Sequence, residues 1–232
     1  MMGTRVFSTN DIKHVAVSGA AEVEFVPGKS SKVTVEYKGK EPQSLADAGI
    51  SVNNSSMVIS GAVGGETSIQ VGGNTIALGG GYANSNVHIQ AGSGSISIGS
   101  GGIRINGKNI MFEDKAGQEV EDGFCHVVKY VVEYVYAPES VTSSGASRIR
   151  GKFNSGDKDM SFKLSGVSSV KVSGQVREAD LQTSGSTELT WAEGTVEKVR
   201  VKASGASGID LSGATVASVT SVSTSGASRL NM

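Results

Sequence analysis

Few groupings of residues in this sequence could do chemistry. Gly102–Asn109 approaches a phosphate-binding loop, in which glycines free backbone amides for the phosphate and a final Ser or Thr binds magnesium. Here Asn109 takes that final position, and strand-forming residues follow it where a helix should begin. We therefore interpret this stretch as part of a hairpin that turns at Asn106-Gly107.

A thiol and an imidazole adjoin at Cys125 and His126. A nucleophilic thiol needs a base within hydrogen-bond reach, but neighbouring residues of a strand face opposite ways. The other histidines, His14 and His88, share no metal-type spacing with His126. The sequence thus predicts no catalytic, cofactor-binding or metal-binding residue, and it does not identify the binding residues. A single cysteine also excludes an internal disulfide.

Carboxylates gather at Asp157 with Asp159 and at Glu119, Glu121 and Asp122. Both groups fall in predicted loops, where solvated charges are the simplest interpretation. Enzymes that cleave polysaccharides with paired carboxylates need both acids on one face of the substrate site.

Composition favours many short strands joined by tight turns. The 232 residues include 32 Gly but only 3 Pro and 1 Trp, and glycine is thus about twice as frequent as usual. A net charge of −1 without long runs of one sign argues against nucleic acid as a partner. No run is long enough for a membrane span, and the start at Met1–Asp11 lacks the apolar stretch of a signal peptide. The chain either stays inside the cell or has lost an export signal.

A repeat of about twenty residues positions these groups. Ser-Gly recurs at 144, 165, 184, 204 and 225, with spacings of 21, 19, 20 and 21. Residues three before, two after, five after and seven after each serine are apolar or small, and we expect all four columns to point inward. The position six after the serine points outward and forms no acidic column: Arg150, Lys171, Thr190, Asp210, Asn231.

Stacking such repeats pairs each strand with its equivalents above and below. The sequence therefore predicts an all-β protein, a parallel β-helix with about twenty residues per coil. Trp191 shares its column with Gly151 and Val172. We expect its ring to fill the space left by these smaller neighbours and its N–H to reach a carbonyl.

The same register extends to the N-terminus, where residues 11–38 form a first coil around Ser18-Gly19. We expect a single β-helix domain over 1–232, with N-terminal coils in 1–60 and regular Ser-Gly coils in 124–232. Residues 61–123 are glycine-rich and less regular. They fit either narrower, irregular coils or an inserted set of hairpins.

Several segments together resemble a known bacterial family. They are Val15–Phe25 with its central Ser-Gly-Ala-Ala, Val33–Glu36, Met57–Ser60, a strand ending at Ala137-Pro138, and the repeated Ser-Gly-Ala-Ser units. In this order they resemble the Putative auto-transporter adhesin family with the head GIN domain, over about 1–60 and 124–232. The resemblance implies a right-handed β-helix shaped like pectin lyases but without their catalytic residues. It also implies an adhesion role at the cell surface or otherwise outside the cytoplasm.

We therefore predict a non-enzymatic adhesion or surface-interaction module that uses no cofactor and binds a cell-surface glycan or protein. A polysaccharide lyase or hydrolase is one alternative, and a cleft with converging carboxylates, or with Asp beside Arg, would favour it. A purely structural scaffold is the other alternative. Met232 directly follows the last inward strand. Because an uncovered strand edge is a template for another chain, we expect a homo-oligomer through the end or edge of the β-helix.

Overall fold

A computed structural model of the chain describes residues 2–61, 68–71, 74–77, 89–91, 96–99, 102–105, 108–110 and 125–232. The chain divides into two compact units, one made of Met1–Ala62 with Phe124–Met232 and the other of Val63–Gly123. No helix among the described residues is long and apolar enough to cross a membrane.

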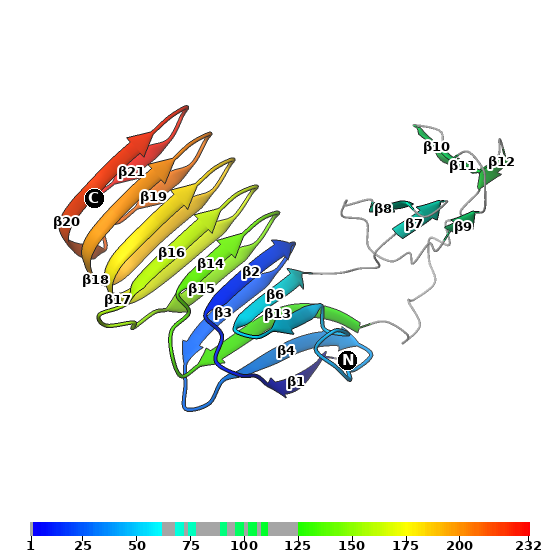
Figure 1. Cartoon of the computed structure of the whole chain (residues 1–232), viewed down its shortest axis with the longest axis horizontal. Helices are drawn as coiled ribbons and strands as arrows, with labels where there is room; N and C mark the ends of the chain where they lie inside the picture. The colour runs from blue at the N-terminus through cyan, green and yellow to red at the C-terminus, as the bar shows by residue number, and fades with distance from the viewer. Residues whose placement is uncertain are drawn as a thin grey trace. The chain divides into compact units, whose positions relative to one another are not determined.

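The first unit is a single sheet of fifteen strands (Figure 1). Its strands are β1 Met2–Ser8, β2 His14–Gly19, β3 Glu22–Pro27, β4 Lys32–Gly39, β5 Ile50–Asn53, β6 Ser56–Gly61, β13 Cys125–Tyr134, β14 Ser140–Ser143, β15 Arg148–Lys152, β16 Asp159–Leu164, β17 Ser169–Thr183, β18 Glu188–Ala203, β19 Gly208–Asp210, β20 Ala214–Thr224 and β21 Arg229–Asn231.

The second unit contains two small sheets. Its strands are β7 Ser68–Val71, β8 Asn74–Ala77, β9 Ile89–Ala91, β10 Ile96–Gly99, β11 Gly102–Ile105 and β12 Lys108–Ile110. β11 pairs with β12 antiparallel, as a hairpin requires, and β10 pairs with β11 in the same manner. The proposed turn at 106–107 itself lies outside the described residues. The described parts of this stretch, 102–105 and 108–110, are paired strands, and β12 takes the place of the helix that a phosphate-binding loop would open.

The predicted parallel β-helix is wrong as the fold class of this chain. The large sheet is mixed and curls into a half-barrel, because β1 pairs antiparallel with β4, β4 with β13, and β5 with β6. The register of β13 explains the departure. It lies between β4 and β3, antiparallel to the first and parallel to the second, so β3 and β4 do not pair as successive turns of one coil.

The stacking of equivalent residues about twenty apart is nevertheless confirmed. Leu189 of β18 pairs with Ile209 of β19, and Ile209 pairs with Leu230 of β21, all in parallel register. β15, β17 and β18 continue the same ladder, in which Ile149 pairs with Val170 and Val170 with Leu189. The twenty-residue period thus sets the parallel part of the sheet, although it does not extend over the whole chain.

Three of the four predicted columns face the core. The columns three before, five after and seven after each serine are buried in the inner repeats, as at Leu181, Leu189 and Trp191, and become more exposed in the last repeat. The prediction that the residues two after each serine point inward is wrong. They lie on the outer surface, where Val167 is 66% exposed. The inward position is one residue later, where hydroxyl side chains are buried: Ser147, Ser168, Thr187 and Ser207.

Trp191 is buried and its N–H reaches a carbonyl as predicted, but other aromatic rings occupy the space beside Gly151. Its side chain is fully buried, and its indole Nε1 donates to the Gly174 carbonyl at 3.4 Å. The ring meets Phe162 edge-on, with centroids 6.1 Å apart. Phe162 in turn meets Phe153, which occupies the space beside Gly151 together with Phe25. A chain of aromatic contacts therefore links Phe25, Phe153, Phe162 and Trp191 within the core.

Candidate functional site

The structure separates the cysteine and histidine that adjoin in sequence. Cys125 is half-buried against the core, whereas His126 is exposed on the other side of β13. Burial raises the pKa of the Cys125 thiol, so little of it is present as the nucleophilic thiolate near neutral pH. This pair is not a nucleophile with its base.

The other residues with chemical potential are not brought together. His14 lies on β2, and its Nδ1 is 2.9 Å from the Ser140 hydroxyl. His88, Glu119, Glu121 and Asp122 lie outside the described residues. Within the ranges that the structure covers, no group of three His, Cys, Asp or Glu side chains could hold a metal ion.

The turn after each strand leaves a groove along the outside of the sheet. The residue after Ser-Gly is exposed in each of the five repeats from Ser144 onward, and these residues stack because the turns themselves stack. We call this surface the corner groove, and we call the outer surface of β3, β15, β19, β21 and the first parts of β17 and β18 the groove face. The floor of the groove consists of Ala20, Ala146, Val167, Ser186, Ala206 and Ala227.

The corner groove comprises two adjoining hollows. One, with a volume of about 530 Å³, crosses β3, β15 and β17 and is bordered by Arg148 and Ser169. The other, of about 540 Å³, crosses β18, β19 and β21 and is bordered by Asp210 and Arg229. Both include Ser186 and Glu188. The hollows therefore form one trough that runs across the strands.

Two carboxylates border the second hollow from adjacent strands. Glu188 lies on β18, and Asp210 lies diagonally across from it on β19, because Thr190 pairs with Asp210. The Asp210 carboxylate accepts hydrogen bonds from the Ser212 hydroxyl at 2.7 Å, the Ser212 amide at 3.0 Å and the Asn231 amide at 3.1 Å. These bonds, the Ser212 hydroxyl first, hold its pKa below the ordinary range.

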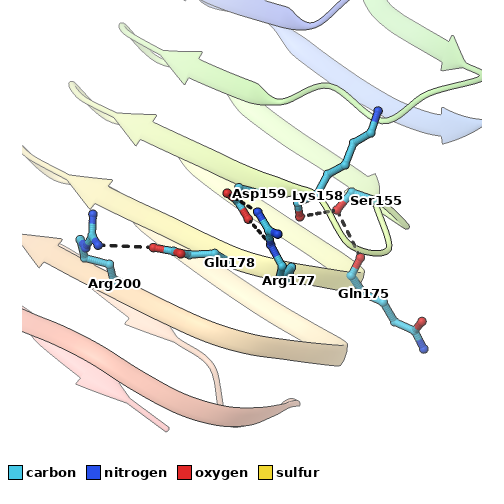
Figure 2. Close-up of polar contacts among 7 residues, drawn as sticks. All are labelled: Ser155, Lys158, Asp159, Gln175, Arg177, Glu178 and Arg200. Atoms are coloured by element: carbon cyan, nitrogen blue, oxygen red, sulfur yellow. Dashed lines mark hydrogen bonds and ion pairs between the residues drawn. The ribbon is translucent and has the colours of Figure 1, made fainter.

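The opposite outer surface carries ion pairs (Figure 2). We call this surface, formed by β2, β14, β16, β20 and the second parts of β17 and β18, the ion-pair face. Arg177 donates two hydrogen bonds to Asp159, at 2.8 and 2.9 Å, and Arg200 lies 3.4 Å from Glu178. Asp159 is thus on strand β16 and paired, and its predicted position as a free charge in a loop is wrong.

The Asp159–Arg177 pair satisfies only part of what an active site needs. The hydrogen bonds from Arg177 lower the pKa of Asp159, which weakens this carboxylate as a base. Both side chains are about half exposed, and neither borders the hollows described above. The turn beside them is held by Ser155, whose hydroxyl donates to the carbonyls of Lys158 and Gln175 at 3.3 and 3.4 Å. We interpret this cluster as structural, because its hydrogen bonds connect β16 and the turn before it to β17.

The sequence did not predict the corner groove, because we expected the residues two after each serine to point into the core. The signal was present in the alternation of the flanking strands. Glycine occupies one position of the turn in a left-handed conformation, which shifts the phase by one residue, so the inward column moves to Ser147 and its equivalents. Small residues at the exposed position allow a ligand to approach the backbone closely.

Comparisons with known proteins place this architecture in a family. Residues 105–231 match the family described as "Putative auto-transporter adhesin, head GIN domain". Among curated proteins, none matches the sequence.

Similar solved structures come from Bacteroides and Parabacteroides species. A "putative adhesin" of Bacteroides fragilis is 10% identical, with 100% of this chain and 96% of that chain covered and a TM-score of 0.49. A "putative adhesin" of Parabacteroides merdae is 10% identical, with 99% and 80% covered and a TM-score of 0.49. A "putative lipid binding protein" of Parabacteroides distasonis is 11% identical, with 100% and 97% covered and a TM-score of 0.41. Because the family match spans more than half of the sequence, the chain belongs to the Putative auto-transporter adhesin family with the head GIN domain.

Proposed function

We propose that the chain is a non-enzymatic adhesion module that binds a linear glycan in the corner groove. The observation that carries the proposal is the trough of small residues, which crosses β3, β15, β17, β18, β19 and β21. A linear polymer lying across successive strands would meet an equivalent position on each of them. Membership of an adhesin family supports the same function.

The chemistry of the groove suits a polyhydroxylated ligand. Its floor has short side chains, so sugar rings can approach the backbone. The polar groups that line the groove include the hydroxyls of Ser169 and Ser186, the carboxylate of Glu188 and the guanidinium groups of Arg148 and Arg229. Hydrogen bonds to charged groups are the stronger ones in such sites. A groove that is open along its length also accepts chains of any length.

The test is a glycan array probed with the wild-type chain and with two variants. Ala206→Trp fills the groove, while Thr142→Trp adds the same side chain to an exposed position of the ion-pair face. We expect binding that Ala206→Trp abolishes and Thr142→Trp preserves. Equal binding by all three chains, or binding only to proteins, would contradict the proposal. A purely structural scaffold predicts no glycan binding by any of them.

A polysaccharide-acting enzyme is the second candidate function, and the two carboxylates Glu188 and Asp210 favour it. They border the same hollow from adjacent strands, and glycoside hydrolysis uses a pair of carboxyl groups at one substrate site. The test is to incubate the chain with the glycans that it binds on the array and to measure whether new chain ends are released. Release that Glu188→Gln abolishes, with binding unchanged, would establish an enzyme. Binding without release supports the adhesion module.

We also propose that two copies associate through the edge of β20 and β21. No described strand pairs with the outer edge of β20. Val222 and Met232, which continue core columns, are 46% and 61% exposed. Light scattering of the wild-type chain should show an oligomer, and Val222→Asp should dissociate it. A monomeric wild-type chain would overturn this proposal.

We propose a location outside the cytoplasm, because the family is one of auto-transporter adhesins. Cell fractionation with an antibody against the chain tests it. Recovery at the surface or in an extracytoplasmic fraction is expected, and recovery only with cytoplasmic markers would contradict it.

A further inference from the structure

Four exposed cations lie together on the groove face. Arg148, Arg150 and Lys152 alternate with inward residues along β15, so all three point outward. Lys171 of β17 lies beside Arg150 in the parallel register. We call these four residues the cationic patch. Arg148 also borders the corner groove, so the patch continues from its edge.

None of the four cations forms an ion pair within the part of the chain that the structure describes. The described ion pairs involve other residues, among them Lys129 with Glu24 and Arg177 with Asp159. The nearest acids on the neighbouring strand β3 are Glu22, beside Arg148, and Glu24, beside Arg150. Because Lys129 binds Glu24 at 2.5 Å, that carboxylate is already engaged. The four cations therefore outnumber the two nearby carboxylates that form no ion pair among the described residues, Glu22 and Glu188.

The register makes the patch electrostatically unfavourable without a ligand. Arg150 and Lys171 are direct neighbours, and equivalent residues of paired strands lie about 4.8 Å apart. Like charges in such positions repel each other and destabilise a sheet. On the ion-pair face, by contrast, Gln182 lies between Lys163 and Lys202 in their column, and Arg200 is matched by Glu178.

We propose that the cationic patch binds the acidic groups of an anionic polysaccharide whose backbone lies in the corner groove. This inference rests on the proposed function and specifies its ligand class. Arg148 joins the two surfaces, since it borders the groove and begins the patch. Carboxylate and sulfate groups are the anions that such polymers carry, and both accept hydrogen bonds from guanidinium and ammonium groups. A polymer with regularly spaced charges would relieve the repulsion between Arg150 and Lys171.

The test measures binding of three polymers: polygalacturonate, which carries carboxylates, dextran sulfate, which carries sulfates, and neutral dextran. The patch variant combines Arg150→Gln with Lys171→Gln. The control variant combines Lys163→Gln with Lys202→Gln, which removes the same charge from two exposed lysines of the ion-pair face. We expect the wild-type chain to bind one or both anionic polymers, less tightly at high salt, and to ignore dextran. The patch variant should lose about tenfold in affinity, and the control variant should not. The polymer that binds more tightly identifies the acidic group.

Each contrary result has a defined meaning. Equal losses in the patch and control variants would show non-specific charge attraction and overturn the inference. Equally tight binding of single-stranded DNA or of anionic lipid vesicles would overturn the assignment to a polysaccharide. Binding of only neutral glycans, sensitive to Ala206→Trp, would overturn the inference and leave the proposed function standing. Polygalacturonate binding that is lost in the patch variant but unchanged by Ala206→Trp would support the patch and remove the groove from the function.

Discussion

Gly185 lies so close to Gly166 that a β-carbon on Gly185 would be 2.7 Å from the Gly166 carbonyl oxygen. This relationship recurs between the equivalent glycines of neighbouring repeats. Gly185 also has φ of 79°, in the left-handed region, where a side chain costs about 1–2 kcal/mol. Both the close approach and the backbone conformation therefore require glycine at this position of the turn.

Replacing Gly185 with Ala should lower the free energy of unfolding by at least about 2 kcal/mol, because the conformational cost and the contact with Gly166 add. Urea unfolding followed by circular dichroism measures the change. Ser186→Ala, at the next and exposed position, is the matched control and should change stability by less than about 0.5 kcal/mol. Equal effects of the two variants would contradict the stacking of the turns.

Trp191→Ala should cost about 3–5 kcal/mol of stability, because it leaves a large cavity in the core beside Phe162. Thermal unfolding of the full chain provides the measurement. Val167→Ala is a suitable control, since Val167 is 66% exposed and its truncation should cost less than about 0.5 kcal/mol. A small loss for Trp191→Ala would place the indole outside the core.

Two buried threonines should respond in opposite ways to the same substitution. The Thr187 hydroxyl has no hydrogen-bond partner among the described residues, so Thr187→Val removes an unsatisfied group and should raise stability by about 1 kcal/mol. The Thr183 hydroxyl donates to Ser207 at 3.0 Å, so Thr183→Val should lower stability by about 1 kcal/mol. Parallel denaturant titrations compare them. Destabilisation by both variants would mean that the Thr187 hydroxyl is hydrogen-bonded.

The Asp159–Arg177 pair makes stability depend on acid pH. Because the pKa of Asp159 is lowered in the folded chain, the pair stabilises the fold above the ordinary carboxyl pKa, and this contribution is lost as the pH falls through the lowered value. The effect is small because both side chains are about half exposed. Arg177→Gln should raise the pKa of Asp159 toward its ordinary value, measured by NMR titration of the carboxyl carbon. An unchanged pKa would contradict the pairing.

The sequence was sufficient to predict the local and repeated features. The recurrence of Ser-Gly correctly placed Leu189, Ile209 and Leu230 beside one another, because each repeat can bury its apolar face only against another repeat. The inward position of Trp191 followed from its place in the repeat, although Phe25 and Phe153 fill the space beside Gly151. The corner groove was missed because glycine shifts the alternation by one residue within the turn, and no apolar pattern records that shift.

The long-range pairing of β13 could not be read from the residues. Its apolar run predicts a strand, but nothing in that run states that Tyr130 pairs with Val23 on one side and Val35 on the other. Strand order depends on the connections between elements, and residues 62–124 separate β6 from β13. The pairing of β13 with both β3 and β4 is the reason why the sheet is mixed and not the expected parallel β-helix.

The insertion of β13 has a consequence for synthesis of the chain. β3 and β4 are joined by a short connection, yet they meet only through a strand whose residues leave the ribosome much later. Until Cys125–Tyr134 emerge, the seam between them stays open, with unpaired amides and carbonyls on both sides. The N-terminal strands must therefore wait for a segment about one hundred residues downstream, and closure of this seam is an event of high contact order that follows translation of more than half of the protein.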